Sequence, residues 1–274
     1  MMVLALIPAA IILWMIYKAD KIEKEPPILL VKLFIFGVIS TLSAMALEII
    51  GGELLLFFFY PDDIVYMAIE NFLIVALAEE IGKYLVVKKI AWNHPAFNYT
   101  FDAIVYAVFA SLGFAAFENI LYLTDESILT AVMRGILAVP GHAIDAVFMG
   151  YFFGIAKRCE VIGNHKGKKR NLRLALWVPV LMHGFYDFCL SVDSVYFMIA
   201  FWVYEIFITI YTIKQIKKFS KEDSALFPTG YPGAGVVMNM RNEGIIKYDP
   251  MTGRPYYVDP SKMNFDPMTG EPLH

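Results

Sequence analysis

Ionisable side chains of the kinds that move protons and bind metals lie inside four long apolar stretches of this sequence. An ionisable residue at membrane depth costs at least a few kcal/mol, and it normally faces a polar interior. The residues concerned are Glu79, Glu80 and Lys83 in the first stretch, Glu118 and Asn119 in the second, His142 and Asp145 in the third, and His183 and Asp187 in the fourth. Their presence on consecutive apolar stretches predicts one polar cluster with a chemical task.

The spacing of the acidic and basic residues in Ala78-Glu79-Glu80-Ile-Gly-Lys83 predicts an ion pair on a helix. Glu79 and Lys83 are separated by four positions, so they share one helix face and can pair. Glu80 is expected to point about 100° away from Glu79, because successive residues of an α-helix are rotated by that angle. This rotation leaves Glu80 as a second carboxylate for another task.

Each histidine has a carboxylate within one helical turn. His142 and Asp145 are three positions apart, and His183 and Asp187 are four apart, so both pairs lie on common helix faces. A carboxylate in this position can accept the second N–H of the imidazole and thereby select its tautomer. We therefore expect Asp145 and Asp187 to support the histidines, as Lys83 and Asn119 support the glutamates.

Two mechanisms of peptide hydrolysis fit these residues. In the first, Glu79 or Glu80 deprotonates a water molecule and His142 or His183 donates to the oxyanion. In the second, His142, His183 and either Glu118 or Glu80 bind one zinc ion, and the remaining glutamate acts as base. The HExxH spacing of many zinc proteases is absent, but ligands on separate helices are physically acceptable. The number of candidate ligands favours the metal.

The elements that must position these residues are long apolar helices. Hydrophobic residues make up 58% of the chain and charged residues 18%, against roughly half and a quarter in soluble domains. Spanning the hydrocarbon core as a helix takes roughly 20 apolar residues. Seven segments meet this requirement, near 1–17, 28–50, 64–87, 102–123, 128–156, 173–191 and 195–213. The composition therefore predicts an all-α, polytopic membrane helix bundle of about seven spans.

The charges of the loops alternate and predict the orientation of the bundle. Lysines and arginines follow the first, third, fifth and seventh segments, whereas the loops near 51–63, 124–127 and 191–194 contain none. Basic loops remain on the cytoplasmic side. The N-terminus is therefore expected outside and the C-terminus in the cytoplasm, with the protein in the cell (cytoplasmic) membrane. Nothing in this charge distribution indicates binding to nucleic acid.

Several other residues are interpreted from their position alone. Glu48 and Glu70 are expected near the outer surface and away from the cluster. Arg134, near the outer end of its segment, is expected to reach the membrane surface or to pair with an acidic loop residue. Pro140-Gly141 is a point at which the fifth segment can break.

The chain divides into a membrane domain, residues 1–218, and a Pro/Gly-rich cytoplasmic tail, residues 219–274. The tail contains an imperfect repeat of a DPMTG motif, within 248–255 and 265–272. Asp-Pro followed by Thr-Gly is turn chemistry. The repeat predicts two tight turns in a largely unstructured tail; the alternative is a docking motif that a partner binds twice.

The polar motifs resemble those of the PrsW family of intramembrane proteases, within the wider superfamily that includes the CAAX prenyl proteases. The resemblance covers roughly 64–190 and rests on Glu79-Glu80-x-x-Lys83, Phe114-x-x-x-Glu118, His142 after a glycine, and His183-x-x-x-Asp187, in that order. It implies hydrolysis of membrane-associated protein substrates. The founding member of the family is associated with cutting an anti-sigma factor, so the resemblance implies substrates of that type or other membrane-anchored proteins.

We therefore expect an intramembrane endopeptidase that acts on membrane-anchored proteins within the lipid bilayer. The main alternative is a proton- or ion-coupled transporter that uses the same Glu, His and Asp cluster. Transporters often contain inverted repeats, and no convincing repeat is visible between the halves of this sequence. A retinal protein would need a lysine on the last span, and 195–213 contains none. A non-catalytic scaffold that acts through its tail is the remaining alternative.

Overall fold

The computed structural model describes residues 2–125, 128–226, 245–248 and 255–258, and most of these are helical. The helices are α1 (Met2–Ala19), α2 (Pro27–Leu55), α3 (Ile64–Ile69), the π-helix η1 (Glu70–Val75), α4 (Ala76–Ile90), α5 (Asp102–Asp125), α6 (Ile128–Ile136), α7 (Ala138–Val161), α8 (His165–Ser191) and α9 (Val195–Lys221). Two short strands follow, β1 (Ile245–Tyr248) and β2 (Pro255–Val258).

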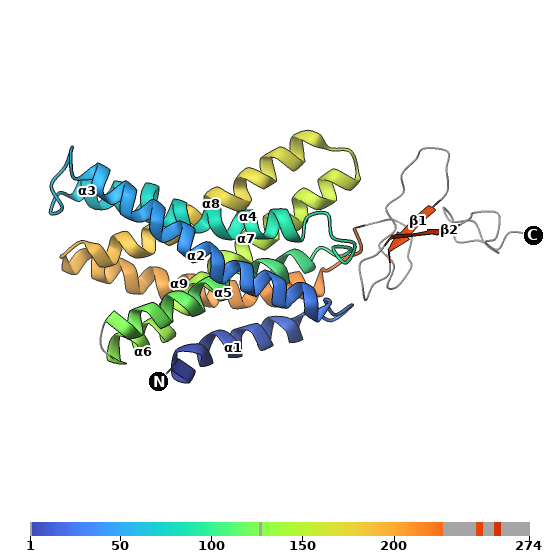
Figure 1. Ribbon diagram of the computed structural model, residues 1–274, viewed down its shortest axis with the longest axis horizontal. Helices are drawn as coiled ribbons and strands as arrows, with labels where there is room; N and C mark the ends of the chain where they lie inside the picture. The colour runs from blue at the N-terminus through green and yellow to red at the C-terminus, as the bar shows by residue number, and fades with distance from the viewer. Residues whose placement is uncertain (1, 126–127, 227–244, 249–254, 259–274) are drawn as a thin grey trace, which may run out of the picture.

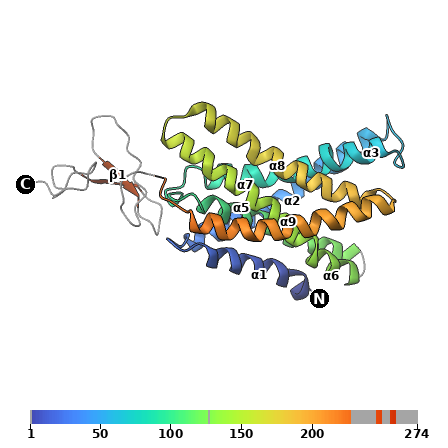
Figure 2. The same ribbon diagram turned by 180° about the vertical axis from the view of Figure 1, so that it is seen from behind.

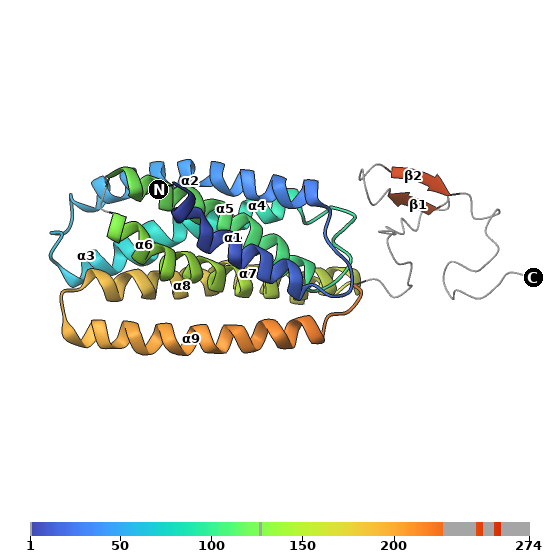
Figure 3. The same cartoon turned by 90° about the horizontal axis from the view of Figure 1, so that it is seen from below.

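The helices run side by side in one elongated bundle with α5 at its centre. Helix α2 lies on one face (Figure 1) and α9 on the opposite face (Figure 2), as the edge-on view in Figure 3 also shows. Helix α5 packs against α1, α2 and α7, and its side chains are almost all buried along its first half. The outward faces of α2 and α9 carry exposed isoleucines, leucines and phenylalanines, as lipid-facing surfaces do.

Small residues allow α5 to approach its neighbours with backbone against backbone. A Cβ atom added to Gly37 of α2 would lie 2.0 Å from the carbonyl oxygen of Ala110 on α5. A Cβ atom added to Gly150 of α7 would lie 2.4 Å from the Cα atom of Ile104 on α5. Glycine at such contacts permits the close van der Waals packing by which membrane helices associate. This packing places the polar residues of α4, α5, α7 and α8 within reach of one another.

Among the residues that the structure describes, five helices are long and apolar enough to cross a membrane. They correspond to Pro27–Leu55, Asp102–Tyr122, Val132–Val161, His165–Ser191 and Val195–Lys221. These helices confirm the predicted all-α membrane bundle. The first and third expected segments are also helical, but the described apolar part of α1, Leu6–Ala19, is shorter. The count of seven spans and the orientation of the termini stay predictions.

The third expected segment, 64–87, is helical throughout, but a π-helical turn interrupts the α-helix before the acidic motif at Glu79 and Glu80. The π-helix η1 separates α3 from α4 and ends just before Ala76. Within it, the Asn71 side-chain amide donates to the Met67 carbonyl at 2.7 Å and to Ser191 Oγ at 3.0 Å. Single π-helical turns are frequent at functional sites. This one ties the helix that carries Glu79 to the end of α8.

The fifth expected segment breaks at Leu137, between α6 and α7. Leu137 has φ −113° and ψ −58°, outside the values of a regular α-helix. Helix α7 then runs through Pro140-Gly141, so the break lies slightly before the position we expected. Pro140 falls in the first turn of α7, where a residue without an N–H costs no helical hydrogen bond.

Hydrogen bonds to Asp223 hold the start of α5 against the end of α9, and Asp102 caps the start of α5 itself. Asp223 Oδ1 accepts from the Thr100 hydroxyl and from the Phe101 N–H, both at 2.8 Å. Asp102 Oδ2 accepts from the Tyr99 N–H at 2.7 Å. The loops that precede α5 and follow α9 are therefore joined at one end of the bundle.

Two further carboxylates are buried at this end, in the loop between α1 and α2. Glu25 accepts a hydrogen bond from the Tyr106 hydroxyl on α5. Burial raises the pKa of Glu25 to about 8 and that of Asp20 to about 6, because the charged forms lose contact with water. The loop is thus attached to α5 through a carboxyl group that favours the protonated state.

Beyond residue 226, the described part of the tail is a pair of antiparallel strands. Tyr248 of β1 pairs with Pro255 of β2, and these two residues lie on either side of the first DPMTG copy in the sequence. The intervening residues 249–254 and the second copy lie outside the described residues. The predicted turns therefore stay predictions.

Candidate active site

A buried lysine joins the two glutamates of α4. Lys83 Nζ donates to Glu79 Oε2 at 3.0 Å and to Glu80 Oε1 at 2.7 Å, and all three side chains are almost completely inaccessible. The expected Glu79–Lys83 pair is present. Glu80 joins it, although we expected it to point elsewhere, because residues three apart are also neighbours on a helix. The motif therefore forms one three-residue ion cluster.

Each ring nitrogen of His183, on α8, lies close to a carboxylate. Nδ1 lies 3.0 Å from Glu80 Oε1, and Nε2 lies 3.1 Å from Asp187 Oδ2, the expected partner one turn along the helix. Nε2 is also 3.8 Å from Glu79 Oε2. These contacts place the imidazole of His183 directly beside both glutamates of α4.

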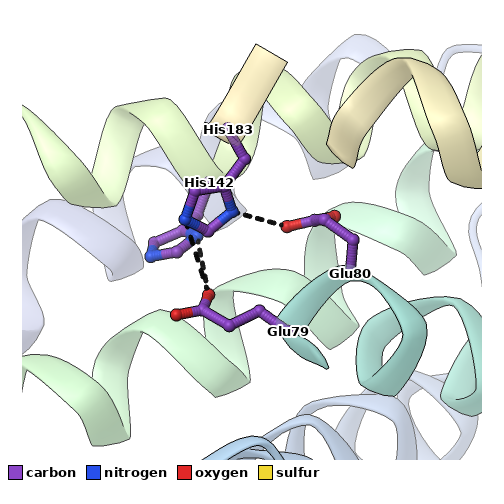
Figure 4. Close-up of side chains that lie close together, drawn as sticks. All are labelled: Glu79, Glu80, His142 and His183. Atoms are coloured by element: carbon purple, nitrogen blue, oxygen red, sulfur yellow. Dashed lines mark hydrogen bonds and ion pairs between the residues drawn. The ribbon is translucent and has the colours of Figure 1, made fainter. Parts of the chain in front are cut away.

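His142 of α7 lies between Lys83 and Glu118. Its Nδ1 is 2.9 Å from Lys83 Nζ, and its Nε2 is 2.9 Å from Glu118 Oε2 on α5. The rings of His142 and His183 meet edge to face, with centroids 5.2 Å apart. Figure 4 shows the two imidazoles and the two glutamates of α4 converging on one point.

One residue that we expected to support the site has a different partner. Asp145 pairs with His183 and not with His142: its Oδ2 lies 4.0 Å from His183 Nδ1, and Glu118 from another helix takes the position beside His142 Nε2. Asn119 is buried next to Glu118, close to Gly135 of α6, and its expected supporting role stays a prediction.

Arg134 contacts the site directly, which the sequence did not indicate. Its Nη2 lies 2.7 Å from Glu118 Oε1, and its guanidinium stacks 3.6 Å from the Tyr122 ring centre. The expectation that Arg134 reaches the surface or pairs with a loop acid is wrong. The break before α7 turns α6 so that this arginine points toward α5.

The glutamates and histidines adjoin a cavity of about 390 Å³. Glu79, Glu118, His142, His183 and Asp187 line it, whereas Glu80 and Lys83 do not. A second cavity of about 330 Å³, between α2, α4 and α5, is also lined by Glu79 and Glu118. Of the two α4 glutamates, Glu79 is therefore the one that lines these two cavities.

Four more carboxylates line the larger cavity: Glu48 of α2, Glu70 of η1, Asp145 of α7 and Glu205 of α9. Glu48 and Glu70 were expected to lie away from the cluster, but both lie at the cavity wall. Glu205 is 7% exposed. Its acidic side chain within the last apolar segment was a signal that sequence analysis passed over.

The donor set fits a divalent metal ion. One ligand atom from each of Glu79, Glu80, His142 and His183 lies within 4.8 Å of all the others. Imidazole nitrogens and carboxylate oxygens are the ligands of many catalytic zinc sites. The ammonium of Lys83, however, already contacts three of these four residues. A metal ion at this point would have to displace Lys83.

Comparison with known proteins agrees with the motif pattern. A family model described as PrsW family intramembrane metalloprotease matches residues 25–212. A protein named Protease PrsW from Oceanobacillus iheyensis is 37% identical, over 76% of this chain and 92% of its own length. A protein of the same name from Geobacillus kaustophilus is 33% identical, over 78% of this chain and 91% of its own length. Another, from Bacillus subtilis, is 32% identical, over 72% of this chain and 86% of its own length. No solved structure matches the chain.

Proposed function

Because the chain belongs to the PrsW family of intramembrane proteases, we propose that its Glu79–His142–His183 cavity hydrolyses peptide bonds of membrane-protein substrates. The protein is an integral membrane protease, and the transporter alternative is not favoured. We propose below which residues carry out the reaction and which kind of membrane protein is the substrate.

The position of Glu79 supports its role as the general base. Its side chain lines both cavities, while Glu80 is enclosed by Lys83 and His183. A base must lie within hydrogen-bond reach of the water whose proton it takes. Glu79 would remove a proton from water as the oxygen attacks the carbonyl carbon, and would then pass this proton to the leaving amine.

The neighbours of Glu79 would prepare it for this task. Lys83 fixes the direction of the carboxylate, and Glu80 holds both Lys83 and His183 in place. His183 borders the cavity and would donate its Nε2–H to the carbonyl oxygen as negative charge develops there. Asp187 accepts from the same nitrogen and has 26% of its side chain exposed, so it can yield to substrate.

Metal binding is the second element of the proposal. Glu80, His142 and His183 would hold a zinc ion beside Glu79, which stays the base; the ion when bound would polarise the substrate carbonyl and lower the pKa of water. The residue that limits this binding is Lys83, because its ammonium contacts Glu79, Glu80 and His142. Glu118, which we also considered as a ligand, lies on the opposite side of the His142 ring.

Substrate and topology complete the proposal. The substrate would be a membrane-anchored regulator of the anti-sigma-factor type, the class that the family resemblance implies. Residues 1–218 would form the catalytic membrane domain, with the N-terminus outside the cell. Residues 219–274 would be a cytoplasmic tail whose repeated motif binds a partner.

The test uses a panel of single-span membrane proteins, each tagged at both ends and co-expressed with the protease. Wild type should cleave at least one of them at a bond in or next to its span, and Glu79→Gln should not. The matched control is Glu53→Gln, which changes an exposed glutamate on α2 and should cleave like wild type. Cleavage by Glu79→Gln at the wild-type rate, with equal membrane insertion, contradicts the assignment of the base.

A further inference from the structure

Arg134 of α6 is connected to the inner site through a continuous series of polar contacts. Its guanidinium contacts Glu118 Oε1 at 2.7 Å, and the other oxygen of that carboxylate contacts His142 Nε2 at 2.9 Å. On the far side of the ring, His142 Nδ1 lies 2.9 Å from Lys83 Nζ. The side chains of Arg134 and Glu118 are 21% and 16% exposed, so the pair is largely shielded from water.

The hydrogen-bond chemistry of these groups determines where the imidazole carries its proton. The ammonium of Lys83 has only hydrogens to offer, so His142 Nδ1 must accept. The hydrogen of a neutral ring then lies on Nε2 and points to Glu118, which accepts it. This arrangement requires a carboxylate that stays an acceptor, and the guanidinium of Arg134 holds Glu118 in that form and direction.

The location of Arg134 makes this contact depend on α6. Helix α6 is separated from α7 by the break at Leu137, so α7 alone does not fix its rotation. Two contacts orient it: Arg134 stacks on Tyr122 of α5, and Gly135 approaches Pro8 of α1 closely. A rotation of α6 would therefore move the guanidinium away from Glu118.

We propose that Arg134 is a positioning residue, whose guanidinium holds Glu118 as the acceptor for His142 Nε2–H and so directs the Nδ1 lone pair of His142 toward Lys83 and the α4 glutamates. Arg134 does not touch the reacting atoms. Its effect on catalysis rests on the proposed function, but its effect on the imidazole does not.

The first test measures the tautomer of His142 by ¹⁵N NMR of histidine-labelled protein in detergent micelles, with His142→Gln used to assign the signal. Wild type should show one protonated and one unprotonated nitrogen, with Nε2 protonated. Arg134→Lys keeps the positive charge and should preserve this pattern. Without the guanidinium, Glu118 no longer holds the ring in place against Lys83, so Arg134→Gln should give averaged or exchanged nitrogen signals. Identical spectra for wild type and Arg134→Gln would overturn the proposal, whether or not the protein cleaves any reporter.

The second test measures cleavage of a tagged single-span reporter by purified variants. Partners of this kind typically contribute about 10–100-fold to activity, so Arg134→Gln should lower kcat by that factor and leave KM within about threefold. Arg134→Lys should recover part of the loss, because it restores charge without the planar guanidinium. The control is Arg158→Gln, which changes an exposed arginine on α7 and should leave kcat unchanged.

A double variant separates positioning from a general contribution to folding. If Arg134 acts through Glu118, then Arg134→Gln should lower kcat no further in a Glu118→Gln background. Fully additive losses, or a fall in kcat that follows thermal stability alone, would overturn the proposal. If wild type cleaves no reporter while the NMR pattern is as expected, the proposed function fails and the positioning role stands.

Discussion

The buried ammonium of Lys83 allows a quantitative test of how the site is held together. Its Nζ lies 3.0 Å from Glu79 Oε2 and 2.7 Å from Glu80 Oε1, and the lysine side chain is 0% exposed. Lys83→Met keeps an unbranched apolar chain of similar length but removes the charge. Glu79 and Glu80 then lose the ammonium that they share, and little water can reach the buried site to replace its hydrogen bonds.

The size of the effect follows from this burial. Removing one partner of a buried ion pair costs about 3–5 kcal/mol, because it leaves an uncompensated charge in a poorly polar environment. For a domain of this size each kcal/mol lowers Tm by about 2–4 °C, so Lys83→Met should lower Tm by roughly 6–20 °C. The double variant Glu80→Gln/Lys83→Met should lose less, since it removes one of the stranded charges as well.

A thiol-reactive dye provides the assay on a Cys159→Ser background, because Cys189 is completely buried, whereas Cys159 is partly exposed and would react in the folded protein. The matched control is Lys89→Met, a change of an exposed lysine on the same helix, which should unfold like wild type. If Lys83→Met unfolds within about 2 °C of the control, the ammonium does not hold the two carboxylates and our account of the cluster is wrong.

Three other predictions follow from the same structure. Because burial raises the pKa of Glu25 from 4.5 to about 8, its contribution to stability is complete below pH 4.5 and disappears as pH rises to about 8; Glu25→Gln should reduce this slope in unfolding curves at pH 5 to 9, most clearly above the pKa of Asp20, which is about 6. Gly37→Ala places a Cβ 2.0 Å from the Ala110 carbonyl oxygen and should cost about 1–3 kcal/mol in unfolding experiments, whereas Gly52→Ala, with nothing within 4 Å, should be neutral; equal stabilities would contradict the packing. Zinc should raise Tm more in Lys83→Met than in wild type, because the ammonium no longer competes for the ligands, and an equal or smaller shift would show that metal binds elsewhere.

The sequence alone determined the membrane bundle and the composition of its polar cluster. Long apolar segments leave the chain no alternative to helices in lipid, because every backbone polar group must be satisfied within the segment. Glutamates and histidines inside such segments are costly enough to be conspicuous. Contacts within one helix were also predictable, and both Glu79–Lys83 and His183–Asp187 occur as expected from their spacing.

Contacts between helices were decided only by the tertiary structure. Sequence spacing gives the angle between residues of one helix but not the rotation of that helix relative to its neighbours. Asp145 therefore faces His183 and not His142, and Arg134 reaches Glu118 across the gap between α6 and α5. Neither contact has a signature in sequence spacing.

The distinction between the two adjacent glutamates of α4 has the same origin. Both glutamates are buried and both contact Lys83, so neither their burial nor this ion pair distinguishes one from the other. The packing of α8 encloses Glu80 beside His183, while the space between α2, α4 and α5 leaves Glu79 facing a cavity on either side. Which carboxylate can meet a water molecule is a property of how the helices pack, because only packing determines where the interior stays empty.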